Sequence, residues 1–150
     1  MAKPRRPVQP DDAYRIWVGG STDYAHKDRP GAAAYIIEHE GRTVDTYIET
    51  DWNTTEFRMI LTVILHAMRT LPEGSLLIFL TNVAYIQNFD KPPTDKSANA
   101  DLIEQCIALK SQHSSVSVQL VTYHKFPNLL ATHQMAHEAM LRLRRASSLL

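Results

Sequence analysis

The alternation of apolar and polar positions predicts three strands at the start of the folded chain. The stretch YRIWV (residues 14–18) reads as a strand that Gly19-Gly20 would close. The segments AAAYIIEHE and RTVDTYIET then flank Glu40-Gly41, which is typical of a β-hairpin turn. We therefore expect these three strands to form an antiparallel meander.

Helical spacing of apolar residues dominates the next segment. Residues 53–71 carry an apolar face, and Pro72-Glu73-Gly74 ends the predicted helix. Five apolar residues, Leu76–Leu80, then predict a buried strand that stops at Thr81-Asn82. The remaining segments predict a short helix at 83–89, a helix at 98–113, a strand at 115–123 and a helix at 129–145.

This order of elements predicts the α/β fold class. Strands joined through long helices usually run parallel, whereas the first three form hairpins. We expect a five-stranded mixed sheet, with three antiparallel strands followed by two parallel ones, flanked by helices. The expected organisation is one domain at 13–146, with a flexible basic and proline-rich tail at 1–12 and a frayed tail at 147–150.

Composition narrows the functional class only slightly. Sixteen Lys and Arg balance sixteen Asp and Glu, so the chain lacks the excess positive charge of many nucleic-acid-binding proteins. No apolar run is long enough to suggest a membrane span, and the basic amino terminus is not followed by the apolar stretch of a secretory signal. The single cysteine, Cys106, fits a reducing, cytoplasmic setting, and its helical spacing favours core packing over reactivity.

Several short stretches, taken with the order of elements, resemble the type 1 ribonuclease H fold of the ribonuclease H-like superfamily. That family's first strand ends in Thr-Asp-Gly-Ser, where this chain has residues 18–21, VGGS, followed by Arg29-Pro30 before the second strand. Residues 53–56, NTTE, match the turn and the Glu that open its first long helix. Further matches are residues 81–83 (TNV), 99–102 (NADL), 123–124 (YH) and 136–137 (AH).

The resemblance implies a site that has lost most of its metal ligands. Family members hold two divalent cations with four carboxylates at the carboxyl edge of the sheet, and the cations drive phosphodiester cleavage. The matching positions here are Gly19, Glu56, Asn82 and His137, which leave one carboxylate of four. Mg²⁺ prefers anionic oxygen ligands, whereas histidine suits softer ions such as Zn²⁺. We therefore expect no cofactor, with Mg²⁺ or Mn²⁺ as the alternative and Zn²⁺ as the less favoured one.

The remaining carboxylate has a structural explanation as well. Asn53-x-x-Glu56 fits a capping box, in which the Glu side chain bonds the N-cap amide, and we favour this interpretation over metal binding. The family pattern can also be aligned with Phe57 at the Glu position. Asp23, four residues beyond Gly19, is a disfavoured substitute for the missing first carboxylate.

A histidine pair offers a different chemistry. His133 and His137 are spaced i, i+4 and therefore share a helical face, a geometry that can bind zinc, with His124 as a third ligand if its loop folds back. Gln134 stands where a zinc protease has its general base Glu, so protease activity is disfavoured. Such pairs occur often by chance, and a partly exposed helix face is the favoured interpretation.

Our preferred hypothesis is a ribonuclease H-like pseudoenzyme that binds nucleic acid, as hybrid or duplex, or acts as a scaffold for a protein partner. A divergent ribonuclease H that cleaves the RNA strand of RNA–DNA hybrids with a modified metal site is the first alternative. A structural homo-oligomer, built through a sheet edge or a helix face, is the second. The candidate nucleic-acid contacts are Lys27, Arg29, Lys91, Lys96, Lys125 and Phe126. Basic residues in loops are often simply solvated, and this remains a competing interpretation.

Overall fold

A five-stranded mixed sheet forms the centre of the molecule in the computed structural model, which describes residues 12–89, 91 and 99–148. The strand order is β3-β2-β1-β4-β5, with antiparallel pairing of β1 with β2 and of β2 with β3, and parallel pairing of β1 with β4 and of β4 with β5. The predicted fold class is therefore confirmed. The strands are β1 Tyr14–Thr22, β2 Gly31–His39, β3 Arg42–Asp51, β4 Leu76–Thr81 and β5 Ser115–Leu120.

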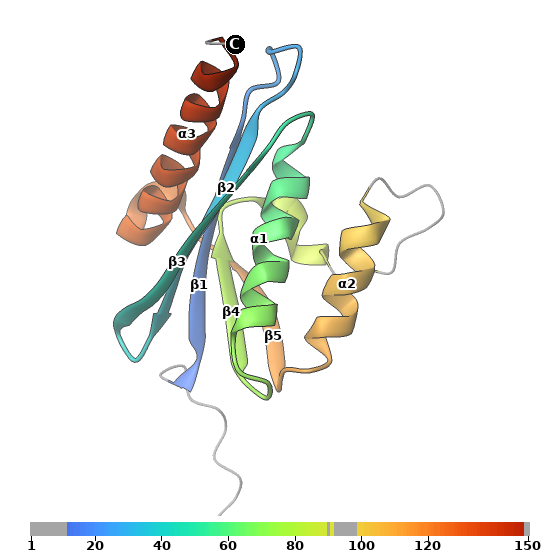
Figure 1. Cartoon of the computed structure of the whole chain (residues 1–150). Coiled ribbons are helices and arrows are strands. Elements are labelled where there is room, and N and C mark those ends of the chain that lie inside the picture. Colours follow the sequence, from blue (N-terminus) through green and yellow to red (C-terminus); the bar gives the residue numbers. More distant parts are fainter. Residues whose placement is uncertain (1–11, 90, 92–98, 149–150) are drawn as a thin grey trace, which may run out of the picture.

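Three α-helices cover the two faces of the sheet. Figure 1 shows α1 (Glu56–Thr70) and α2 (Ala100–Lys110) on one side and α3 (Pro127–Ser148) on the other. Two short 3-10 turns, η2 (Ala84–Asn88) and η3 (Tyr123–Lys125), follow β4 and β5. The larger core cluster lies between α1, α2 and the sheet and includes Cys106, so the prediction that this cysteine packs in the core is confirmed.

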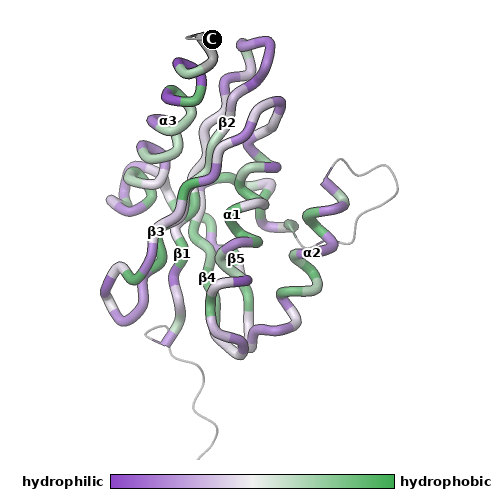
Figure 2. The backbone as a smooth tube through the Cα atoms, in the orientation of Figure 1, coloured by the Kyte–Doolittle hydropathy of each residue, from purple (hydrophilic) through white to green (hydrophobic). Residues whose placement is uncertain are grey.

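Hydropathy follows this layering. In Figure 2 green is prominent along the central strands, purple gathers at the turns, and both colours alternate along α3. Within the described residues, no helix combines the length and the apolar character needed to cross a bilayer.

The first strand does not stop at the two glycines. β1 continues through Gly19 and Gly20 to Thr22, because both residues keep their pairing with β2, opposite Ala34 and Ala33. Their lack of a side chain serves packing instead. A Cβ at Gly19 would lie 2.9 Å from Oγ1 of Thr132, on the α3 side of the sheet.

The expected capping box is wrong. Asn53 has a positive φ of 52° and lies outside the helix, and α1 starts at Glu56. Thr55 is the N-cap, and its hydroxyl accepts a hydrogen bond from the Arg58 N–H at 3.1 Å. The predicted N-cap, Asn53, lies two residues before the observed one, Thr55. Both Asn and Thr are good N-caps, so the residue type alone did not distinguish them.

Three other boundaries differ from the prediction. α2 spans Ala100–Lys110 where a helix over 98–113 was expected, and residue 98 lies outside the described residues. β5 ends at Leu120 because the next residues turn into η3. α3 begins at Pro127, a residue well suited to the first helical turn since it needs no N–H partner there. The helix continues past the expected end at residue 145 to Ser148, and residues 149–150 of the expected frayed tail lie outside the described residues.

Candidate functional site

The carboxyl ends of β1 and β4 meet the start of α1 and the first half of α3. The parallel pairing of β1 with β4 places Gly20 and Asn82 at the same edge of the sheet, where ligands of α/β proteins usually bind. Three of the four positions expected to form the site contact separate partners: Glu56 contacts Tyr85, Asn82 contacts His133 and His137 contacts Ser21. We refer to this region as the carboxyl edge and define it by Gly20, Ser21, Tyr24, Glu56, Asn82, Tyr85, Tyr123, His133 and His137.

Asn82 is held by His133. The two side chains approach to 2.8 Å between Nε2 of His133 and Oδ1 of Asn82. An amide oxygen only accepts, so the imidazole donates from Nε2 in this contact. Burial lowers the pKa of His133, although the negative charge of Glu56 and the backbone of Gly20 act in the opposite direction. The pair is therefore a neutral one near pH 7.

Glu56 lies between two tyrosines. Its Oε1 accepts a hydrogen bond from the Tyr85 hydroxyl at 2.7 Å, and its backbone N–H donates to the hydroxyl of Tyr24 at 2.9 Å. Burial and the adjacent Glu56 carboxylate raise the pKa of Tyr85, so this phenol stays protonated and remains a donor. The observed partner of the Glu56 side chain is therefore a phenol and not the N-cap amide that the capping box would require.

Asp23 points toward a different partner. Its Oδ2 lies 2.7 Å from Nη1 of Arg144 on α3, and its Oδ1 accepts from the backbone N–H groups of Ala25 and His26. The Arg144 hydrogen bond holds the pKa of Asp23 below its usual value. Asp23 therefore connects the loop after β1 to α3. This role agrees with the expectation that it is not a substitute metal ligand.

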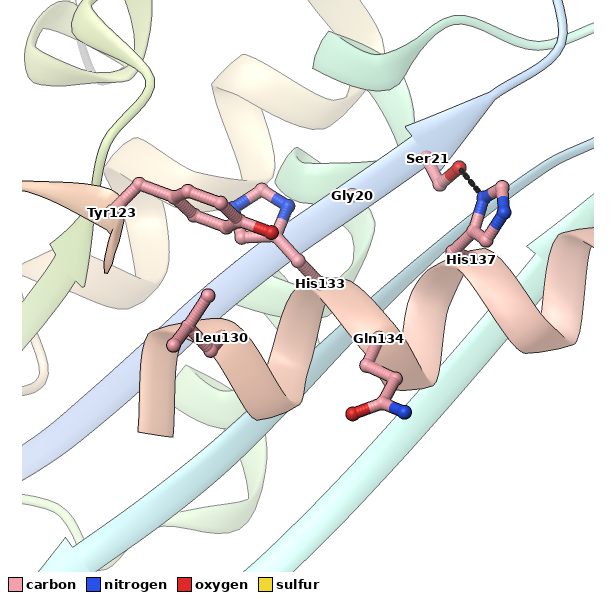
Figure 3. A pocket seen from close by; sticks show the side chains of 7 residues that line it. All are labelled: Gly20, Ser21, Tyr123, Leu130, His133, Gln134 and His137. Carbon is pink, nitrogen blue, oxygen red and sulfur yellow. Dashed lines mark hydrogen bonds between the residues drawn. The ribbon is translucent and has the colours of Figure 1, made fainter. Parts of the chain in front are cut away.

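A shallow hollow of about 580 Å³ opens beside the histidines (Figure 3). Nδ1 of His137 lies 3.2 Å from Oγ of Ser21, and the Tyr123 ring stands edge-on to the ring of His133 at 4.7 Å. Leu130 and Gln134 complete the α3 side of the hollow, and Gly20 forms part of the β1 side.

The three candidate zinc ligands do not converge. His133 and His137 share one face of α3 as predicted, yet each ring contacts its own neighbour, and His124 lies exposed in η3. Among the residues that the structure describes, no three His, Cys, Asp or Glu side chains are grouped so as to hold a metal ion.

The candidate nucleic-acid contacts divide into two groups. Lys27, Arg29, Lys91 and Lys125 are exposed, whereas Phe126 is half-buried with its ring 5.4 Å from that of Trp17, so packing explains Phe126. Lys96 lies outside the described residues.

Sequence reasoning missed the aromatic residues of the carboxyl edge. Tyr24, Tyr85 and Tyr123 are 60%, 46% and 39% exposed, although tyrosine rings are usually more buried. Each of these tyrosines follows the carboxyl end of a strand that reaches this edge. That position in the sequence could have identified them as candidate site residues.

Comparison with known proteins assigns no family. No protein-family model matches the sequence, and no curated protein matches it either.

Proposed function

We propose that the chain is a ribonuclease H-like domain that binds nucleic acid at the carboxyl edge of its sheet without cleaving it by metal-ion catalysis. The observation that carries the proposal is the set of exposed tyrosines, Tyr24, Tyr85 and Tyr123, around the Asn82–His133 pair. Aromatic rings bind bases by stacking, at about 1–3 kcal/mol per base, and do so with little sequence preference. Neutral amide and imidazole groups add hydrogen bonds to base or sugar.

The charges of the carboxyl edge oppose metal catalysis. A pair of Mg²⁺ ions needs several anionic oxygens close together. Glu56 is the carboxylate at this edge, and it is bonded to Tyr85, while Asp23 is paired with Arg144.

Phosphate contacts have candidates on the flanking loops. Lys27 and Arg29 are exposed in the loop that also carries Tyr24, and exposed Lys125 lies two residues from Tyr123. Such neighbours place a cation beside an aromatic ring, the combination that single-strand-binding surfaces use. The formal charge of zero predicts moderate affinity that decreases with salt.

The test is a binding and cleavage assay on one labelled sequence presented as RNA, as DNA and as RNA–DNA hybrid. Each is tested with Mg²⁺, Mn²⁺ and Zn²⁺ separately, at low and physiological salt. We expect binding without cleavage, and Tyr85→Ala or Tyr123→Ala to weaken binding about 5- to 150-fold, the equivalent of one lost stacked base. Tyr85→Phe keeps the ring and should bind normally, and Val44→Ala, on β3, is the matched surface control.

Two results would overturn this proposal. Metal-dependent cleavage that disappears in Glu56→Gln and in His137→Ala would establish a divergent nuclease. The absence of both binding and cleavage, with the chain folded by circular dichroism, would favour a scaffold for a protein partner.

A further inference from the structure

The hollow beside the two histidines has an apolar part. Tyr123 and Leu130 both line it (Figure 3), and both are exposed for their type, at 39% and 38%. Tyr123 opens η3 and Leu130 lies near the start of α3, so two consecutive elements bring them to the same place. An aromatic ring and an aliphatic side chain thus offer an apolar surface to a ligand.

Polar groups of α3 line the same hollow. Leu130, Gln134 and His137 follow at i, i+4 and i+7, which places them on one face of the helix. The Gln134 amide can donate and accept, and its nearest contact is a long one, 3.5 Å to Oε1 of Glu138.

His137 keeps one ring nitrogen for a ligand. Its Nδ1 lies 3.2 Å from Oγ of Ser21, and this is the hydrogen bond that the ring makes with the described part of the chain. If the hydroxyl donates to Nδ1, Nε2 carries the proton and donates. If Nδ1 donates to the hydroxyl, Nε2 accepts. Either tautomer therefore leaves a hydrogen-bonding group beside Gln134.

The hollow suits an uncharged ligand. Its lining, as far as the structure describes the chain, contains no Lys, Arg, Asp or Glu. A phosphate group that entered it would lose hydration without gaining a cation. The volume of about 580 Å³ falls within the range of about 300–1,000 Å³ that is usual for small-molecule sites.

We infer that the hollow receives one unpaired base, and that the ligand of the carboxyl edge is therefore single-stranded nucleic acid and not a duplex. The inference rests on the proposed function and adds the class of strand to it. A base is the planar, uncharged part of a nucleotide. Its faces pack against Tyr123 and Leu130, while its edge meets Gln134 and His137.

A duplex or hybrid cannot offer a base in this way. Its base faces are stacked on their neighbours, and its Watson–Crick edges are already paired. The phosphates of a single strand stay outside the hollow, where exposed Lys125, two residues from Tyr123, is available to them.

The first experiment uses wild type and one short labelled strand in three forms. The strand is tested alone, paired with its full complement, and paired with a complement that lacks the partner of one central base. We expect the strand alone to bind about 5- to 150-fold more tightly than the full duplex, the equivalent of one stacked base. The duplex with one unpaired base should also bind more tightly than the full duplex.

Two failures are distinguishable in this experiment. Equal affinity for all three forms would overturn the inference and leave nucleic-acid binding at the carboxyl edge intact. No binding of any form would remove the proposed function and the inference together.

Variants of the lining locate the base. Leu130→Ala and Gln134→Ala should weaken binding of the single strand and leave the affinity for the full duplex unchanged. Their matched controls are Ile48→Ala on β3, an aliphatic residue that is 40% exposed, and Gln112→Ala, exposed between α2 and β5. Neither control residue lines the hollow. Unchanged single-strand binding in both lining variants would overturn the inference.

NMR separates a base site from a phosphate site in the same hollow. We expect adenosine, which has a base and no phosphate, to shift the ring resonances of His137, and inorganic phosphate to leave them in place at constant pH. The opposite result would show that the hollow binds the phosphate and would overturn the inference.

Discussion

His133 of α3 donates a hydrogen bond from Nε2 to Oδ1 of Asn82, across 2.8 Å, and so ties the last helix to the carboxyl end of β4. The amide oxygen suits a neutral imidazole, whereas a carboxylate in its place would favour the imidazolium form. Burial lowers the pKa of His133, and the uncharged Asn82 side chain does not oppose that effect, so the ring stays neutral. The same contact occupies the oxygen that a metal ion would need.

Asn82→Asp is expected to raise the pKa of His133 by about 1–3, because it places an opposite charge within hydrogen-bonding distance of the ring. The measurement is a titration of the histidine ring resonances by NMR. Gln119→Glu, which adds the same charge at an exposed position on β5, should leave the His133 titration unchanged. An unmoved His133 pKa in the Asn82→Asp variant would show that the contact is not made in solution.

Mild acid is expected to destabilise the fold through His133. Burial keeps its folded-state pKa below the ordinary value of 6.5, so the unfolded chain binds the proton more readily. Stability contributed by the neutral ring is complete above pH 6.5 and is lost as pH falls from there toward the lowered pKa. Urea unfolding at pH 7.5 and pH 5.5 measures this difference.

His133→Gln should reduce that loss between the two pH values, while His124→Gln, at an exposed position in η3, should keep it. Asp23 and Asp101 do not contribute in this window. Arg144 and Arg58 lower their pKa values from 3.8, so their share of stability is lost only at more acid pH. An identical pH dependence in wild type and His133→Gln would exclude His133 as the source.

Gly19→Ala is expected to destabilise the protein by about 1–3 kcal/mol, the usual cost of overpacking. Its Cβ would lie 2.9 Å from Oγ1 of Thr132 and 3.0 Å from the backbone nitrogen of His133, and the backbone of α3 cannot yield as a side chain can. Gly20→Ala is the matched comparison, since its Cβ would meet only side-chain atoms, of Glu56 and Ile60, at 3.1 Å and 3.2 Å. Chemical denaturation should therefore give Gly19→Ala a lower free energy of unfolding than Gly20→Ala. The reverse order would contradict close packing at Gly19.

Local patterns predicted the sheet and its helices because each depends on nearby residues. Alternation in residues 32–50 and the apolar run Leu76–Leu80 specify strands within a few positions. The carboxyl edge was harder to predict, because its contacts join distant segments: Tyr85 with Glu56, and Arg144 with Asp23. Such pairs have no short-range signature. The same limit explains Gly19, whose neighbour Thr132 lies on the last helix.

The start of α1 gives a final prediction that separates two explanations of one short sequence. Thr55→Ala should cost about 1 kcal/mol, because its hydroxyl is the acceptor for the Arg58 N–H. Glu56→Gln keeps the size of the side chain and should leave the cap intact, since the Glu56 carboxylate bonds Tyr85 and not the N-cap amide. Urea unfolding of both variants distinguishes these roles. A Thr55→Ala variant as stable as wild type would show that the Thr55 hydroxyl does not cap α1.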